Sequence, residues 1–248
     1  MRVFHFVNEP HGLDNLRKRR LKVATLYELN DPFEFFGVNL GDKALRHAFG
    51  VMKNEMALKQ GLLCFSRTWH NPVLWSHYAD RHTGLCLGFD VPDHLFTCVF
   101  YSRKRLAIEP QAFVPGARFD DQTLLRLFFT KYSHWRYENE VRGLVTLRDK
   151  DPLTNLYFAD FGDDLRLNTV IVGSQSSVTR ATLQEALGDL DSTVQKFKAR
   201  LAFKTFRVVQ QRNSDGDNHL LRLGSGQEGF EPIAYRQRLG RIKRGGTL

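Results

Sequence analysis

The sequence contains few cysteines, and this excludes two classes of small stabilised domain. Cys64, Cys86 and Cys98 are odd in number and far apart, with no CxxC pair and no histidine at ligand spacing. Neither a disulfide framework nor a structural zinc site fits this arrangement. We therefore expect the three thiols to be small, buried apolar side chains.

Long apolar runs are also missing. No window reaches the roughly 18 to 20 uncharged apolar residues that cross a bilayer. The segment Met1–Pro10 carries His5 and Glu9 where a signal peptide has an apolar core. With 42% apolar and 25% charged residues, the composition is that of a soluble globular protein. We expect a cytoplasmic protein with no membrane partner.

Several well-known catalytic motifs are absent. The chain has no GxxxxGK[ST], no GxGxxG after a strand, no HExxH and no GxSxG. A metal-dependent nuclease of the Asp…Glu-x-Lys kind needs a lysine where this sequence has Glu140 or Arg142. These absences weigh against nucleotide-triphosphate, dinucleotide-fold, zinc-protease and serine-hydrolase chemistry, and no metal is predicted.

The excess positive charge lies at the two ends of the chain. The net charge is +9, from 36 basic and 27 acidic residues. Residues 1–22 hold six basic and two acidic residues, and residues 232–248 hold five basic and no acidic residues. The remainder is balanced. The basic end is either a solvated terminus or a segment that attracts the phosphates of a nucleic acid or nucleotide.

Apolar periodicity predicts one α+β domain. Strands are expected at 3–7, 21–26, 62–66, 85–90, around 98–101, and at 137–147, 169–173 and 201–210. Helices are expected at 12–20, 43–60, from 72 to before Gly84, and at 120–132 and 177–187, the last capped by Ser177 or Thr179. Residues 30–34 are either a helix start or an ordered turn. Residues 213–229 have the composition of a loop.

One predicted strand carries two carboxylates. Alternation along 137–147 places Glu138, Glu140 and Arg142 on one face. Two carboxylates this close repel each other, so we expect the pair only where a function requires it or a neighbouring positive charge offsets the repulsion. The pair is either catalytic, with its pKa values set by the neighbouring charges, or part of a solvated face with Glu–Arg pairing.

Polar and aromatic side chains elsewhere are further candidates. Trp75, Tyr78 and His82 are spaced to share one face of the helix that begins at Pro72. They form either a core stripe or a platform for a ligand. His5 lies within an apolar strand, and Ser66 at the end of a strand is placed to reach a phosphate.

Together these segments resemble a bacterial family, domain of unknown function 2971. The resemblance spans residues 1–210 and follows the blocks Leu-Asn-Asp-Pro-Phe-Glu (29–34), Cys-Phe-Ser (64–66), Leu-Trp-Ser-His-Tyr-Ala (74–79), Trp-x-Tyr-Glu-x-Glu-x-Arg (135–142) and Val-Ile-Val-Gly (170–173). Residues 211–248 are then a polar, Gly-rich and basic extension. Members of this family occur among mobile-element and phage-defence genes.

The order of these blocks is similar to that of the ADP-ribosyltransferase superfamily. The likeness implies a split, mixed β-sheet flanked by helices and NAD as a substrate. It implies His5 and Tyr78 as contacts for NAD, and we expect Trp75, Ser66 and His82, candidates from their positions in the predicted elements, to contact NAD as well. The pair of glutamates is implied as catalytic, with Glu140 preferred because the second Glu of a Glu-x-Glu pair contacts the ribose in arginine-directed members. Unlike them, this chain has no Ser-Thr-Ser block before the pair.

Two functions follow as hypotheses. The first is an enzyme of phage defence or a toxin that uses NAD to modify a protein or nucleic acid, or hydrolyses NAD. Glu140→Ala is expected to abolish this activity without disturbing the fold. The alternative is a non-catalytic module that binds nucleic acid or a partner, with Trp75 and the basic ends as contacts.

Overall fold

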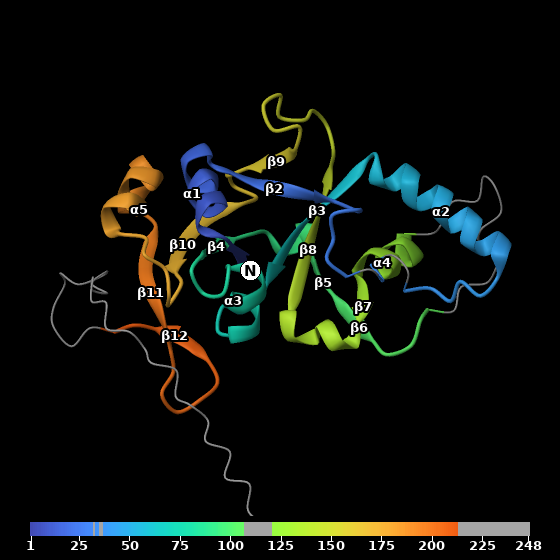
Figure 1. Cartoon of the computed structure of the whole chain (residues 1–248). Helices are drawn as coiled ribbons and strands as arrows, with labels where there is room; N and C mark the ends of the chain where they lie inside the picture. The colour runs from blue at the N-terminus through green and yellow to red at the C-terminus, as the bar shows by residue number, and fades with distance from the viewer. Residues whose placement is uncertain (32, 35–36, 107–120, 213–248) are drawn as a thin grey trace, which may run out of the picture.

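Most of the apolar segments expected to be strands join one large mixed sheet, as seen in a computed structural model that describes residues 1–31, 33–34, 37–106 and 121–212 (Figure 1). Within these residues the strands are β1 (Arg2–Val7), β2 (Arg20–Thr25), β3 (Gln60–Ser66), β4 (Leu85–Asp90), β5 (Phe96–Cys98), β6 (Phe100–Ser102), β7 (Thr130–Tyr132), β8 (Glu140–Thr146), β9 (Tyr157–Asp160), β10 (Arg166–Val172), β11 (Gln195–Leu201) and β12 (Val208–Gln210). The α-helices are α1 (Glu9–Lys18), α2 (Lys43–Ala57), α3 (Pro72–Tyr78), α4 (Asp121–Phe129) and α5 (Arg180–Leu187). The prediction of one α+β domain is confirmed.

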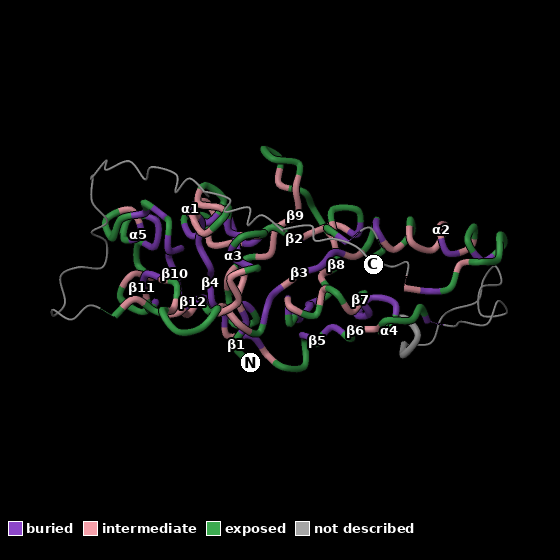
Figure 2. Tube along the Cα trace, turned by 60° about the horizontal axis from the view of Figure 1, so that its bottom comes forward, coloured by how far each residue is buried: buried purple, intermediate pink, exposed green. Residues whose placement is uncertain are grey.

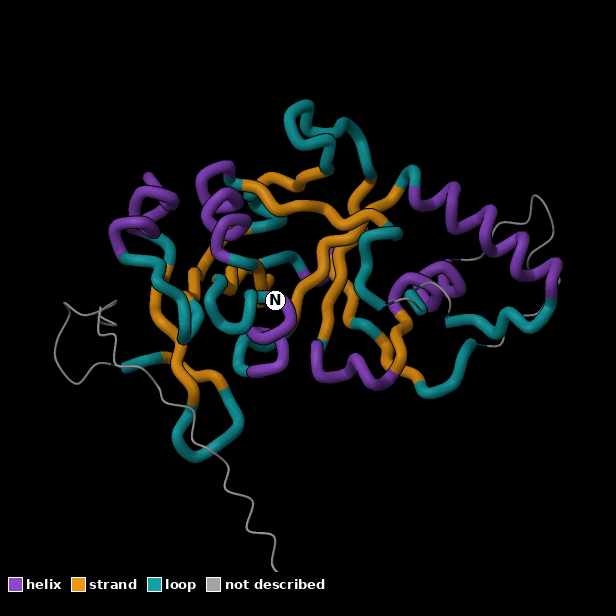
Figure 3. Tube along the Cα trace, viewed as in Figure 1, coloured by secondary structure: helices purple, strands orange, loops and turns teal. Residues whose placement is uncertain are grey.

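The order of strands along the sheet is β12-β11-β10-β4-β1-β3-β2-β9, and β8 joins β3 to β5. β10 and β11 pair in parallel, whereas the other neighbours in the large sheet are antiparallel. β6 and β7 form a separate parallel pair. Figure 3 shows the central strands with helices on either side.

Helices cover both faces of the β1-β4-β10 half of the sheet. Val3, Leu87 and Val170 belong to the apolar cluster beneath α1 and α5. Phe6 and Ile171 belong to a second cluster, against α3. β4 is buried on both faces, as an apolar strand between two layers must be (Figure 2). A third cluster joins α2 and α4 to the other half of the sheet.

Capping side chains define the starts of α1, α3 and α5, and Asp42 caps α2. Asn71 accepts a hydrogen bond from the Val73 amide and Thr179 accepts one from the Thr182 amide, so the predictions of Asn71 and of the Thr179 alternative are confirmed. Asn8 caps α1 in the same way. The predicted start of that helix at Gly12 is therefore wrong, because the Asn8 cap begins the helix at Glu9.

Other boundaries also differ from the prediction. α3 ends at Tyr78, before the expected Gly84, because residues 80–82 adopt positive φ. Residues 130–132 are strand β7, although a helix was expected there. The single strand expected at 201–210 is a hairpin of β11 and β12, since 202–207 leave the sheet. Of residues 30–34 the structure describes all but 32, and Phe33 and Glu34 are in a turn, one of the two alternatives, with the Asp31 carboxylate accepting from the Phe33 amide.

The remaining predictions have mixed outcomes. Of the three free cysteines, Cys86 is buried, Cys64 is half-buried and Cys98 is exposed, so the expectation of burial is wrong for Cys98 at the edge strand β5. The loop expected at 213–229 and most of the C-terminal extension lie outside the described residues. Among the helices that the structure describes, none combines the length and apolar character that crossing a bilayer requires.

Candidate functional site

A cavity of about 210 Å³ lies where β1 and β3 diverge. β1 pairs with β4 at six positions, but it meets β3 only at Phe4 and Ser66. β2 pairs with the other end of β3, at Gly61 and Leu62. The part of β3 between Leu62 and Ser66 therefore borders a gap in the sheet, which we call the β1–β3 cavity. Its lining residues are Phe4, His5, Phe6, Ala24, Glu28, Leu29, Asn30, Glu34, Cys64, Phe65, Ser66, Leu74, Tyr78, Lys131, Glu138, Glu140 and Arg142.

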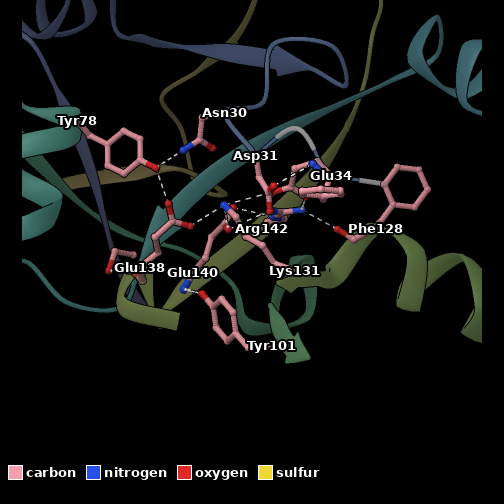
Figure 4. A network of polar contacts seen from close by, with 12 residues as sticks. Asn30, Asp31, Glu34, Tyr78, Tyr101, Phe128, Lys131, Glu138, Glu140 and Arg142 are labelled. Carbon is pink, nitrogen blue, oxygen red and sulfur yellow. Dashed lines mark hydrogen bonds and ion pairs between the residues drawn. The ribbon is translucent and has the colours of Figure 1, made fainter. Parts of the chain in front are cut away.

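One wall of the β1–β3 cavity is a buried cluster of charged side chains, Glu34, Lys131, Glu138, Glu140 and Arg142 (Figure 4). Arg142 is fully buried, and its guanidinium contacts two carboxylates: Nε lies 2.7 Å from Glu140 Oε1, and Nη1 lies 3.0 Å from Glu34 Oε2. Lys131 Nζ contacts all three carboxylates, at 2.6 Å from Glu138 and at 3.2 Å from both Glu34 and Glu140. A buried charge is stable only when paired in this way.

The two glutamates of the predicted pair differ in their electrostatics. Burial acts to raise the pKa of Glu140, but Arg142 and Lys131 together lower it to about 2. Burial raises the pKa of Glu138, although Lys131 acts to lower it. Burial acts to lower the pKa of Lys131, but the three neighbouring carboxylates outweigh this and raise it. Glu140 is thus a firmly ionised partner of Arg142, whereas Glu138 holds its charge less firmly.

Glu138 lies at the end of a 3₁₀ helix (Ser133–Glu138), not on the strand where it was predicted. Asn139 follows in the left-handed conformation, with φ of 46°, and Glu140 begins β8. The predicted strand alternation is therefore wrong at Glu138. Both carboxylates still reach Lys131, because the turn at Asn139 redirects the chain between them.

Tyr78 contacts Glu138 from the opposite side of the cavity. Its hydroxyl donates to Glu138 Oε1 at 2.5 Å and accepts a hydrogen bond from the Asn30 side-chain amide. Burial and the neighbouring Glu138 raise the pKa of Tyr78, so the phenol stays protonated. Figure 4 shows the phenol ring directed toward the carboxyl group. Each Glu138 oxygen therefore has a different partner, Tyr78 on one and Lys131 on the other.

His5 lines the cavity from β1. Its Nδ1 lies 3.2 Å from the Cys64 carbonyl oxygen on β3, the geometry of an Nδ1–H donor that spans the gap. Burial lowers the pKa of His5, although the hydrogen bond to Cys64 opposes this. The ring is therefore neutral near pH 7, and with Nδ1 as the donor its Nε2 is left as an acceptor.

Five of the seven predicted site residues line this one cavity: His5, Ser66, Tyr78, Glu138 and Glu140. Ser66 has a structural role there. Its hydroxyl donates to the Glu138 carbonyl at 2.6 Å and accepts from the Thr68 amide at 3.2 Å. These bonds orient the Glu138 backbone. The Ser66 hydroxyl was predicted to reach a phosphate, but its hydrogen is already donated to the Glu138 carbonyl.

Trp75 and His82 do not line the β1–β3 cavity. Trp75 is fully buried, packs edge-on against Phe6 with ring centroids 5.2 Å apart, and donates from its indole to the Trp69 carbonyl. His82 lies beyond the end of α3, and its ring stacks on Trp75 at 6.1 Å. The core interpretation of Trp75 is therefore correct, and Trp75 is unavailable as a contact for NAD or a nucleic acid.

Glu34, Lys131 and Arg142 belong to the site, although none was predicted as a site residue. A signal existed for two of them, because Lys131 closely follows the apolar run Leu127–Phe129 and Arg142 sits between apolar residues, Val141 on one side and Gly143-Leu144-Val145 on the other. A charge in such a setting requires a partner. Glu34 carried no signal of this kind, since its partner Arg142 is 108 residues away in the chain.

The described residues hold no group of three or more His, Cys, Asp or Glu side chains arranged to bind a metal ion. In comparisons with known proteins, no family model, curated protein or solved structure matches this chain. The chemistry of the cavity must therefore be argued from its own geometry.

Proposed function

We propose that this protein cleaves the bond between nicotinamide and ribose in NAD and transfers the ADP-ribose to an acceptor or to water, in the manner of an ADP-ribosyltransferase. One observation carries the proposal: a neutral imidazole, a phenol and a carboxyl group with a raised pKa border one cavity where the sheet diverges. The resemblance to the family described above supports a setting in phage defence or as a toxin.

The reaction explains why such groups are required. As the bond between C1′ of the ribose and the nicotinamide nitrogen breaks, its electron pair leaves with nicotinamide and positive charge develops on the ribose. A carboxylate fixed nearby stabilises this charge without reorganising. The acceptor or water then attacks C1′ and loses a proton. The neutral His5 offers an acceptor for a ribose hydroxyl or the carboxamide, and Tyr78 an aromatic face for the nicotinamide.

The size of the β1–β3 cavity limits what it holds. Its volume of about 210 Å³ is below the roughly 300–1,000 Å³ of pockets that enclose a whole drug-sized ligand. It fits the nicotinamide and part of its ribose, so the adenosine half would lie along the surface outside.

Glu138 is our preferred catalytic residue, in place of the Glu140 favoured by sequence resemblance. Both oxygens of Glu140 are occupied, Oε1 by Arg142 and Oε2 by Arg142 and Lys131. Such full pairing leaves little charge to act on a substrate. Glu138 has one oxygen on the uncharged Tyr78 hydroxyl, which can yield to a ligand.

The test is release of nicotinamide from NAD, measured by chromatography with wild-type protein and with Glu138→Gln. We expect the variant to lose roughly 10²- to 10³-fold in rate, the usual loss of one fixed electrostatic partner. Glu185→Gln is the matched control, because this exposed glutamate on α5 is remote from the cavity. Folded wild-type protein that releases no nicotinamide, or a fully active Glu138→Gln, would refute the proposal.

A further inference from the structure

A second concavity, of about 350 Å³, is lined by residues of β6 and β7 and shares Lys131 with the β1–β3 cavity. Figure 1 shows β6 and β7 next to each other. We call this concavity the basic groove, and it is lined by Phe33, Gly37, Ser102, Arg103, Lys104, Arg105, Thr130, Lys131 and Tyr132. Lys131 lines both spaces. A ligand in the basic groove would therefore lie next to the proposed site of NAD cleavage.

The lining of the basic groove is positively charged. Arg103, Lys104 and Arg105 are consecutive and exposed, and none of the lining residues that the structure describes is acidic. Within the described residues, the glutamates closest to the groove lie on the other side of Lys131 and are already paired with it. The three exposed cations thus face solvent with their charge available to an anion.

The basic run is held in place by backbone contacts. Ser102 Oγ donates to the Lys104 carbonyl at 2.6 Å and accepts from the Lys104 amide at 3.1 Å. The Leu106 amide donates to the Gly37 carbonyl, and the Asn39 amide donates to the Leu106 carbonyl at 2.9 Å. These bonds tie the end of the segment that carries the three cations to Gly37 and Asn39, so Gly37 and the cationic segment keep a fixed position relative to each other.

Two exposed aromatic rings border the same groove. Phe33 is 52% exposed and Tyr132 is 43% exposed, so both rings are accessible to a ligand in the groove. The Arg105 guanidinium lies 5.4 Å from the Phe33 ring centroid, and the Tyr132 ring stacks on His134 at 4.5 Å. Exposed rings beside a row of cations are the elements that bind single-stranded nucleic acid, through base stacking and phosphate contacts.

We infer that the basic groove binds single-stranded nucleic acid. A duplex fits less well, because its bases are already stacked and would leave Phe33 and Tyr132 without partners. Resting on the proposed NAD cleavage, the inference further identifies this strand as the acceptor of ADP-ribose. An acceptor here would lie next to Lys131, which also lines the β1–β3 cavity.

The inference is tested by fluorescence anisotropy of the full-length protein with a labelled single-stranded oligonucleotide over a series of salt concentrations. The first variant is Arg103→Gln/Lys104→Gln/Arg105→Gln. We expect roughly tenfold weaker binding and a salt slope smaller by about 2, from three lost phosphate contacts. A second variant, Phe33→Ala/Tyr132→Ala, should bind at least about 30-fold more weakly with an unchanged salt slope, because each lost stacking contact is worth about 1–3 kcal/mol and stacking involves no counterions.

The matched control removes the same charge elsewhere. Arg148→Gln/Lys150→Gln/Arg180→Gln alters exposed residues beyond β8 and at the start of α5, none of which lines the basic groove. It should bind the oligonucleotide almost as well as wild type. Equal losses in the control and the groove variants, or equally tight binding of a duplex, would overturn the inference.

Two further measurements separate this inference from the proposed function. Glu138→Gln should keep its affinity for the oligonucleotide, since Glu138 does not line the basic groove. Transfer of ADP-ribose from labelled NAD to the oligonucleotide should require both Glu138 and the groove cations. Binding without NAD cleavage by the wild type would refute the proposed function alone. NAD cleavage without binding of the oligonucleotide would refute the inference that the groove binds nucleic acid. So would a triple variant whose affinity for NAD falls while its affinity for the oligonucleotide is unchanged.

Discussion

At the scale of single residues, Glu138 and Glu140 are two positions apart yet differ in chemistry. Glu140 is held ionised by Arg142 and Lys131, whereas Glu138 shares Lys131 with two other carboxylates and is hydrogen-bonded to a phenol. Glu140 thus stabilises the cluster of charged side chains, whereas Glu138 is the residue that we propose as catalytic. The expectation that Glu140→Ala leaves the fold intact conflicts with this geometry, because the substitution leaves Arg142 buried with one carboxylate fewer.

Glu140 should therefore contribute to stability in a pH-dependent way. Removing one partner of a buried ion pair typically costs about 3–5 kcal/mol, so Glu140→Gln should lower the free energy of unfolding by a similar amount near pH 7. Its folded-state pKa is lowered from 4.5 to about 2, so the stability it provides is present above pH 4.5 and is lost as the pH falls toward 2. Urea unfolding at several pH values should show the two proteins converging in this window. A difference that is constant with pH would contradict the assignment.

At the scale of elements, the junction between the 3₁₀ helix Ser133–Glu138 and β8 positions the site. Asn139 has φ of 46° and ψ of 51°, a left-handed conformation that asparagine and glycine tolerate and β-branched residues avoid. This one residue ends the helix and starts the strand. Glu138 and Glu140 consequently reach the same lysine from two different elements.

Asn139→Val should cost about 1–2 kcal/mol of stability from the strained backbone, and nicotinamide release should fall because Glu138 is displaced. Asn139→Gly should keep both properties close to wild type. Asn155→Val is the matched control, since Asn155 has φ of 58° but lies in the exposed loop between β8 and β9. This control should lose similar stability with full activity. Equal activity in the two valine variants would refute the positioning role of Asn139.

At the scale of the whole molecule, the sheet contains a weak seam. β1 and β3 share one paired position, and β2 meets β3 at two, so few backbone bonds join the α1–α5 side to the α2–α4 side at this place. A ligand in the β1–β3 cavity contacts residues of both sides at once. Its binding should therefore stabilise the seam more than the strands elsewhere.

NAD should raise the melting temperature of Glu138→Gln, which we expect to bind but not consume it. At 100 times the dissociation constant, a single site adds about 2.7 kcal/mol to the free energy of unfolding. Hydrogen exchange should slow in β1 and β3, whereas the β11–β12 hairpin, which lines no part of the cavity, serves as the internal reference. An unchanged melting temperature, or equal slowing in the hairpin, would argue against NAD in this cavity.

The sequence by itself determined the apolar strands at 3–7, 62–66 and 85–90, because a short apolar run bounded by turn residues has few other stable conformations. It also indicated the Asn71 cap, and it named as site candidates five side chains that the structure brings to one cavity. Only the tertiary structure decided that Trp75 is in the core and that Glu34 pairs with Arg142 across 108 residues. The reason is physical: periodicity and capping are local, whereas burial and ion pairing depend on which distant segments the fold brings together.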